Sequence, residues 1–171
     1  MMEQRLNELI IDILRKNEVL VAIAIKQRAK FEGWLKFELA YRLLDYDCDL
    51  KIEYPYPNNA NLRADIFANG ALIELKTANT NYKIAQCQTR TRPIKKNISS
   101  IIDDIKKLRN AGGSYKKNIA FVLFPIDSGG KYKVNIKRIE EEGHIHLICK
   151  SIEINEVPIL VCSAEVSKQI T

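Results

Sequence analysis

The sequence predicts an α/β domain in which helices flank a mixed β-sheet, and three segments carry this prediction. Residues 62–77 form two alternating runs joined by Asn69-Gly70, the dipeptide that two-residue hairpin turns favour. Residues 94–110 have apolar side chains at helical spacing. Residues 118–125 are a continuous apolar run, as expected for a buried strand parallel to its neighbour. A hairpin, a crossover helix and a buried strand therefore follow one another along the chain.

Helices and one more strand are predicted before the hairpin. Residues 3–15 have an apolar stripe at helical spacing, so they predict an amphipathic helix. The apolar run 19–25 fits a buried helix or a short strand, and the basic residues after it favour the helix. Residues 31–44 predict a strong helix. Residues 47–54 alternate like an edge strand, which the prolines that follow are expected to end.

After the buried strand, the sequence predicts a short helix over 134–142 and strands over 144–154 and 158–162. His144 and His146 would share one face of the first of these strands. No third ligand accompanies them, so an ordinary surface pair is favoured over a metal site.

The length of 171 residues predicts a single domain covering 1–171. Within it, 1–30 are expected to be an N-terminal helical addition, 31–125 the core, and 126–171 a C-terminal strand-rich extension. No apolar run is long enough to span a membrane, and the first residues lead into an amphipathic segment instead of a signal-peptide core. We therefore expect a cytoplasmic protein with no membrane partner.

The cysteines show no pattern that predicts a zinc site or a disulfide framework, because no CxxC pair is present. Reduced thiols are the expectation for a cytoplasmic chain. The four cysteines are Cys48, Cys87, Cys149 and Cys162.

Positive charge is concentrated in the middle of the chain. Between Lys76 and Lys117 there are eleven Lys or Arg and two acids, a net charge of +9, whereas the whole chain has +6. A basic segment of this kind attracts polyanions such as nucleic acid, although a solvated basic surface is the ordinary alternative.

The predicted hairpin places two carboxylates opposite one another. With Asn69 and Gly70 as the turn, Asp65 faces Glu74, and Lys76 lies on the same face. That face would be polar and acidic, whereas the opposite face, with Leu62, Ala64, Ile66, Ile73 and Leu75, would be apolar. Like charges at this spacing destabilise a sheet, and a bound divalent cation would turn the repulsion into ligation.

The string of Asp65, eight residues and Glu74-Leu75-Lys76 resembles the motif of the PD-(D/E)xK nuclease superfamily, which has the restriction-endonuclease-like fold. Ala64 stands where many members have proline. The resemblance implies an αβββαβ core over residues 31–125 and a Mg²⁺ site that Mn²⁺ can share. It implies that Asp65 and Glu74 ligate the metal and that Lys76 orients the attacking water.

The same resemblance implies a third acidic ligand on the first core helix. Glu38 is the preferred residue for this catalytic and metal-binding role, and Glu32, on another face of that helix, is the alternative. Many members also have a glutamine soon after the lysine, and Gln86 or Gln88 could be that residue.

The polar segment 78–92 and the start of the next helix are candidates for contact with nucleic acid. Their amides and cations suit hydrogen bonds to phosphates and base edges. The residues expected there are Gln86, Gln88, Arg90, Arg92, Lys95 and Lys96.

These observations predict a metal-dependent endonuclease that acts on nucleic acid, with DNA the preferred substrate. A homodimer would suit cleavage of a duplex, because one site cuts one strand. The alternatives are a catalytically inactive nucleic-acid-binding or assembly domain on the same fold, and a structural α/β protein whose hairpin is only a surface feature.

Overall fold

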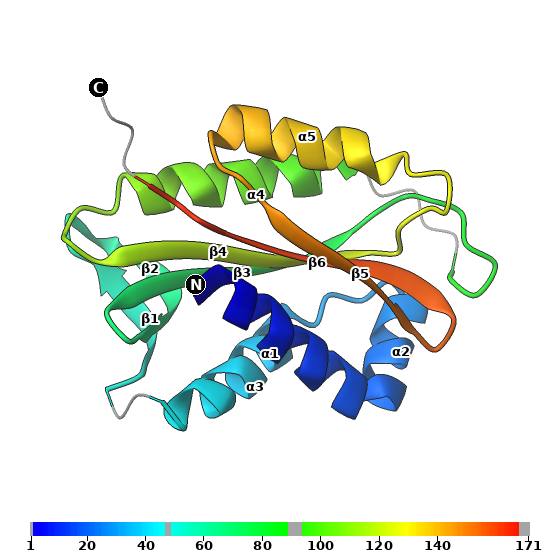
Figure 1. Cartoon of the computed structure of the whole chain (residues 1–171), viewed down its shortest axis with the longest axis horizontal. Helices are drawn as coiled ribbons and strands as arrows, with labels where there is room; N and C mark the ends of the chain where they lie inside the picture. Colours follow the sequence, from blue (N-terminus) through cyan, green and yellow to red (C-terminus); the bar gives the residue numbers. More distant parts are fainter. Residues whose placement is uncertain (1, 47–48, 89–93, 168–171) are drawn as a thin grey trace.

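A six-stranded mixed sheet lies between two layers of helices in the computed structural model, which describes residues 2–46, 49–88 and 94–167 (Figure 1). The strands lie in the order β1-β2-β3-β4-β6-β5. The helices are α1 (Met2–Lys16), α2 (Glu18–Lys26), α3 (Glu32–Leu44), α4 (Ile94–Arg109) and α5 (Tyr132–Gly143). The strands are β1 (Lys51–Tyr56), β2 (Asn59–Ala68), β3 (Ala71–Asn79), β4 (Lys116–Phe124), β5 (Ile148–Ile154) and β6 (Val157–Glu165).

Most predicted elements are confirmed. The run 19–25 is helical, and β4 pairs parallel with β3 after the crossover helix α4. Strand β1 lies at the edge of the sheet, as its alternation indicated. It continues through Pro55 to Tyr56, however, because a proline at an edge need not donate a ladder hydrogen bond.

The predicted strand at 144–154 begins only at Ile148. His144 ends helix α5 in a left-handed conformation with φ of 46°, so the expectation that His144 and His146 share a strand face is wrong. Gly143 is the last residue of the helix. The left-handed turn that ends many helices, often at a glycine, is made here by His144.

Each face of the sheet has its own apolar core. Helices α1, α2 and α3 cover one face and α4 and α5 cover the other (Figure 1). Helix α1 belongs to the first core, since it packs against β5 and β6 and its stripe is fully buried. The buried stripe consists of Leu6, Ile10, Ile13 and Leu14.

The hairpin has the predicted turn and register. Asn69 and Gly70 have φ of 51° and 68°, the positive values of a type I′ turn. The pairs Ala68–Ala71, Phe67–Leu72 and Ile66–Ile73 are those expected, but the ladder between β2 and β3 ends there. The strands therefore separate at Asp65, where the acidic site was predicted.

The predicted division of the hairpin into one polar and one apolar face is wrong. Ile66 packs in the core beneath α1, whereas Ala64 packs in the core beneath α4, so the alternation of β2 is interrupted at Asp65. The neighbouring strand is irregular at the same level, since Glu53 has a φ of 52°. The face that contains Glu74 is covered by α4, and Leu62 is exposed.

Two of the cysteines form a disulfide, so the expectation of reduced thiols is wrong for them. Cys149 and Cys162 are directly paired on the antiparallel strands β5 and β6, with Cα atoms 4.1 Å apart. Thirteen residues separate them in sequence, and only the strand register brings them together. Cys87 is a free, buried thiol, and Cys48 lies outside the described residues.

Within the described ranges, no helix combines the length and the apolar character that crossing a membrane requires.

Candidate active site

Asp65 connects the two separating strands of the hairpin. Its Oδ2 accepts a hydrogen bond of 2.8 Å from the backbone N–H of Leu75 on β3, which replaces the missing ladder bond. Its Oδ1 lies 3.4 Å from Nζ of Lys36 on α3. Lys36 also forms an ion pair with Glu53 of β1. Asp65 is thus held between the sheet backbone and a cation from the α1 side of the sheet.

Glu74 is an almost fully buried carboxyl group with 8% of its surface exposed. The hydroxyl of Tyr56 on β1 donates a hydrogen bond to its Oε1. Burial raises the pKa of Glu74 to about 8; the Tyr56 hydrogen bond opposes the rise, and the charges of Asp65 and Asp104 add to it. Burial and the charge of Glu74 likewise raise the pKa of Tyr56. Both groups are therefore kept neutral near pH 7.

Lys76 is paired with an acid that the sequence analysis did not single out. Its Nζ lies 2.8 Å from Oδ2 of Asp104 on α4 and 3.9 Å from Oε1 of Glu32 on α3. Burial alone would lower the pKa of Lys76, but the hydrogen bond and charge of Asp104, with Glu32 and Glu74, raise it. Lys76 is therefore a cation with acidic partners from both faces of the sheet.

The first-helix acid that reaches this site is Glu32, the alternative, and not the preferred Glu38. Besides its approach to Lys76, Glu32 accepts a 3.0 Å hydrogen bond from the backbone N–H of Thr77 through Oε2. Glu38 is partly exposed on α3 and forms no hydrogen bond or ion pair with Asp65, Glu74 or Lys76. Six residues separate the two glutamates, which places them on different sides of the helix.

The cluster contains more acids than lysines, and the charges of Asp65 and Asp104 add to the effect of burial, which is the main cause of the raised pKa of Glu74. A hard divalent cation, which prefers carboxylate oxygens, would relieve the imbalance at Asp65 and Glu74. In the described parts of the chain, however, no group of three or more His, Cys, Asp or Glu side chains is arranged to hold a metal ion. The acids of the cluster are Glu32, Glu53, Asp65, Glu74 and Asp104, and the lysines are Lys36, Lys76 and Lys107.

Some of the residues predicted to contact nucleic acid lie on the elements that form the site, and others lie elsewhere. Lys95 and Lys96 are exposed in the first turn of α4, and Nδ2 of Asn97 ties this turn to the carbonyl of Asn79 at the end of β3, at 2.8 Å. Gln88 is instead bonded to Gln27 at 2.6 Å, beside the end of α2. Gln86 is exposed, and Arg90 and Arg92 lie outside the described residues.

The segment after β3 is fastened to the end of α2 by a buried guanidinium group. Arg28 donates a 2.6 Å hydrogen bond to the carbonyl of Thr80 and further hydrogen bonds to the carbonyls of Tyr82 and Gln88. Three backbone carbonyls of this segment are satisfied by one side chain.

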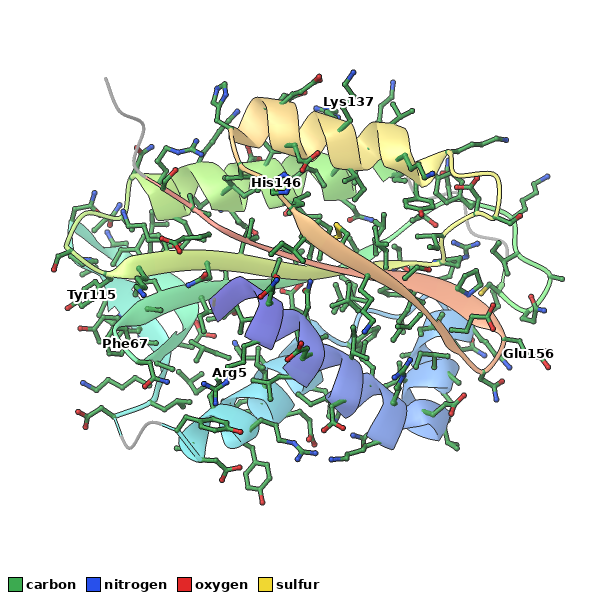
Figure 2. The ribbon with its side chains drawn as sticks, viewed as in Figure 1. Arg5, Phe67, Tyr115, Lys137, His146 and Glu156 are labelled. Carbon is green, nitrogen blue, oxygen red and sulfur yellow. A yellow bond between two sulfur atoms is a disulfide. The ribbon has the colours of Figure 1, made fainter. Side chains whose placement is uncertain are left out.

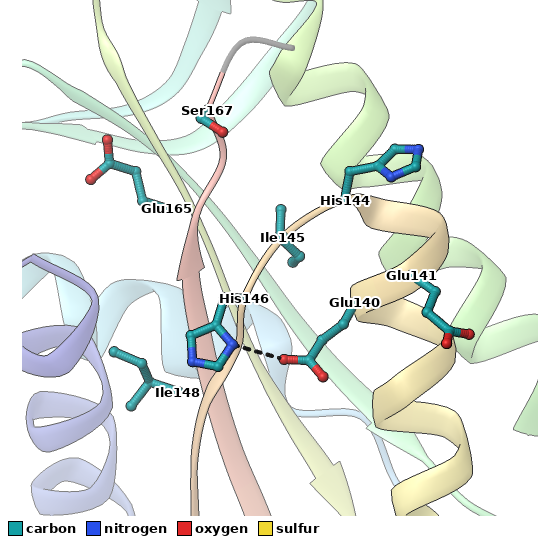
Figure 3. A pocket seen from close by; sticks show the side chains of 8 residues that line it. All are labelled: Glu140, Glu141, His144, Ile145, His146, Ile148, Glu165 and Ser167. Atoms are coloured by element: carbon teal, nitrogen blue, oxygen red, sulfur yellow. Dashed lines mark ion pairs between the residues drawn. The ribbon is translucent and has the colours of Figure 1, made fainter. Parts of the chain in front are cut away.

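The two histidines border a separate cavity of about 540 Å³ between α5 and the ends of β5 and β6 (Figure 3). Nδ1 of His146 lies 3.4 Å from Oε1 of Glu140, and His144 projects away from this pair (Figure 3). The same Glu140 oxygen accepts a 2.9 Å hydrogen bond from the backbone N–H of Leu147. Both histidines are exposed but they do not point toward one another, and the cavity shares no lining residue with the acidic cluster.

Five residues of the site were missed by sequence reasoning: Lys36, Glu53, Tyr56, Asp104 and Lys107. A signal for Asp104 existed, because it interrupts the apolar stripe of its helix between Ile101 and Ile105 and is buried there. A charged residue at a stripe position needs a partner. Tyr56 and Lys36 had no comparable signal, since their contacts depend on the β1–β2 register and on how α3 lies across the sheet.

No protein-family model, no curated protein sequence and no solved structure matches this chain.

Proposed function

We propose that this protein hydrolyses phosphodiester bonds of nucleic acid, preferentially DNA, with the help of a divalent metal ion. The observation that carries the proposal is the buried carboxyl of Glu74 beside Asp65, at the point where two strands separate, with Lys76 two residues further on. The order α3-β1-β2-β3-α4-β4 agrees with the αβββαβ core that the resemblance to PD-(D/E)xK nucleases implies.

Asp65 and Glu74 offer the two carboxylates with which a hard cation can be held, and no third ligand side chain joins them among the described residues. Asp65 and Glu74 would hold Mg²⁺, or Mn²⁺ in its place, and such ions complete their coordination with water and substrate phosphate. Bound there, the ion would supply charge stabilisation and a more acidic water molecule. Glu32 is placed for an indirect role, because it contacts Lys76 and the backbone at Thr77.

The lysine and its partner acids have separate roles in this proposal. Lys76 donates hydrogen bonds to the nucleophile or to the scissile phosphate, and its raised pKa keeps it a donor at neutral pH. Asp104 orients the Lys76 ammonium from α4. Glu74 gives up its proton before it serves as a ligand, so metal binding is expected to become tighter as pH rises toward 8.

The test is cleavage of labelled single-stranded, duplex and branched DNA in Mg²⁺ or Mn²⁺. The substitutions Asp65→Asn, Glu74→Gln and Lys76→Met remove one function each with little change in volume. We expect each to lower the cleavage rate by roughly 100-fold or more. The matched control is the exposed pair Lys137 and Glu141 on α5, whose substitution by Met and Gln is expected to leave cleavage unchanged.

The inactive nucleic-acid-binding domain is the second candidate, and one observation favours it. Among the described residues no three acidic or other ligand side chains are close enough for a metal site, and Lys76 is already paired with Asp104. This candidate predicts binding that weakens with salt, no cleavage of any substrate and no effect of Mg²⁺ on the melting temperature. Metal-dependent cleavage that is lost in all three variants would reject it.

A further inference from the structure

Three aromatic side chains form a cluster at the turn end of the hairpin. The rings of Tyr54 on β1 and Phe67 on β2 are stacked, with centroids 4.5 Å apart and planes 22° apart. Tyr115, just before β4, packs edge-on against both, at 5.2 Å from Phe67 and 6.2 Å from Tyr54. Figure 2 shows Phe67 and Tyr115 near one another at one end of the sheet, far from Glu156 at the other. We call Tyr54, Phe67 and Tyr115 the aromatic cluster.

The aromatic cluster is not a closed part of the core. All three side chains remain partly exposed, although they pack against the core beneath α4. Nζ of Lys51 lies 5.6 Å from the ring centroid of Tyr54, so a cation accompanies the rings. Partly exposed aromatic rings with a cation beside them are the composition that stacks nucleic-acid bases.

Tyr115 also borders a cavity. The cavity has a volume of about 340 Å³, within the range of small-molecule sites. Two consecutive lysines, Lys116 and Lys117, line it, with Glu165 as its acidic member. Tyr115 thus contacts the other two aromatic side chains and borders a cavity with the exposed Lys116, whereas Nζ of Lys117 donates a 3.0 Å hydrogen bond to the carbonyl of Arg109.

The aromatic cluster is continuous with the acidic site. Tyr54 is two residues from Tyr56, which donates to Glu74, and Phe67 is two residues from Asp65. Two residues along a strand span about 7 Å, roughly the length of one nucleotide unit. The exposed lysines of α4 lie beyond the opposite end of the site, near Asn79. The rings, the carboxylates of Asp65 and Glu74 and the lysines of α4 therefore follow one another in this order along the sheet.

We propose that the aromatic cluster is a stacking platform for unpaired bases, so that the substrate of the acidic site is single-stranded or locally unpaired nucleic acid. The proposal rests on the proposed function and names its substrate class. Bases inside a duplex are stacked on one another and cannot use such rings, whereas unpaired bases can. Stacking tolerates any base, so little sequence preference is expected.

The test is binding of a labelled oligothymidylate and of a duplex of the same length, measured by fluorescence anisotropy in a chelator so that nothing is cleaved. The variant Tyr115→Leu keeps an apolar side chain and removes the ring, whereas Tyr115→Phe keeps the ring and removes only the hydroxyl. We expect Tyr115→Leu to weaken single-strand binding by roughly 5- to 100-fold and Tyr115→Phe to bind as the wild type does. Duplex binding is expected to be weaker and equal in all three proteins.

Tyr41→Leu is the matched control, because Tyr41 is exposed on α3, away from the aromatic cluster. Urea unfolding of each variant separates loss of binding from loss of folding. Equal single-strand affinity for Tyr115→Leu and Tyr115→Phe, or tighter binding of the duplex, would overturn the platform.

The nuclease proposal is decided separately by cleavage in Mg²⁺. If Tyr115→Leu cleaves duplex DNA as well as the wild type does, the platform is rejected and the nuclease proposal is kept. Ring-dependent binding of single strands without any cleavage would keep the platform and reject the nuclease.

Discussion

At the scale of a single residue, Glu74 shows that burying a carboxyl group close to other acids has a cost in stability. Its carboxyl is protected from water and has Asp65 and Asp104 nearby, so its pKa is about 8 instead of the usual 4.5. Folding therefore binds a proton that the unfolded chain would release above its ordinary pKa. The protein without metal is expected to be less stable in mild alkali than in mild acid.

This gives a pH prediction with a definite sign. The contribution of Glu74 to the free energy of unfolding should be greatest below pH 4.5. It should decrease as pH rises toward 8 and stay constant above pH 8. The total loss is on the order of a few kcal/mol, since one unit of pKa difference is about 1.4 kcal/mol. Urea unfolding in a chelator across this range should show the loss. Glu74→Gln should flatten the profile, whereas Glu141→Gln on the surface of α5 should keep it; a Glu74→Gln profile as steep as that of the wild type would contradict the assignment.

The Lys76–Asp104 pair gives a second residue-scale prediction. Asp104→Asn leaves the half-buried ammonium of Lys76 without its nearest partner and should destabilise the protein by about 2–3 kcal/mol. The double variant Asp104→Asn, Lys76→Met should lose less than the sum of the single losses, because no unpaired charge remains. Lys107→Met is the control: Lys107 bonds the same carboxylate, but it is 49% exposed and its loss should cost under about 1 kcal/mol.

The sequence was sufficient for part of the site and not for the rest. The two-residue turn predicted the register as far as Ile66–Ile73, which brings Asp65 near Glu74, but it did not predict that the ladder ends before Asp65. The choice between Glu32 and Glu38 depended on how α3 lies across the sheet, which is a property of packing that helical spacing leaves open. Asp104 comes from the opposite layer, about thirty residues later in the chain, so only its misfit in an apolar stripe could have pointed to it.

At the scale of elements, the hairpin turn depends on backbone conformation alone. A Cβ added at Gly70 would meet no atom within 4 Å, and the same holds for Gly33 in the first turn of α3. The two glycines differ in conformation, since Gly70 has a φ of 68° and Gly33 is helical.

The two glycines therefore give a matched pair with opposite expected signs. Gly70→Ala should destabilise the protein by about 1 kcal/mol, because a side chain disfavours the left-handed region. Gly33→Ala should stabilise it by roughly 0.5–1 kcal/mol, because alanine is the better helix former. Urea midpoints measure both, and a stabilising Gly70→Ala would mean that the turn is not of type I′.

Element types were predictable from periodicity, but the irregularities were not. The apolar stripe of α4 and the continuous run of β4 predicted a helix and a buried parallel strand correctly. The interruption of alternation at Asp65 and the left-handed Glu53 left no mark in the sequence, because neither position contains glycine. The pairing of Cys149 with Cys162 was hidden for another reason, because it follows from the β5–β6 register.

At the scale of the whole molecule, the N-terminal helices belong to the core that supports the site. Leu6 and Ile10 of α1 are fully buried in the same apolar cluster as Ile73 and Leu75 of β3. Helix α1 is therefore part of this core, although it precedes residues 31–125, where the sequence predicted the core of the domain.

Removal of residues 1–30 is expected to prevent folding. The truncation would expose the apolar face of β5 and β6 that α1 covers. Circular dichroism and a urea titration would show the loss of a cooperative transition. The milder variant Leu6→Ala should retain folding at a cost of about 2–5 kcal/mol. A cooperative transition in the truncated chain would show that α1 is dispensable.

The acidic cluster takes side chains from helices on opposite faces of one sheet. Glu32 and Lys36 approach from α3, and Asp104 approaches from α4. The spacing of the two helical layers therefore influences the distance between Glu32 and Asp104, the carboxylates on either side of Lys76. A change of volume deep in either core, far from any substrate, would alter the spacing of these charges. Substitutions that change activity are therefore also expected at apolar positions of the core beneath α4. Ile101 is such a position, because its side chain is buried there and does not contact the substrate.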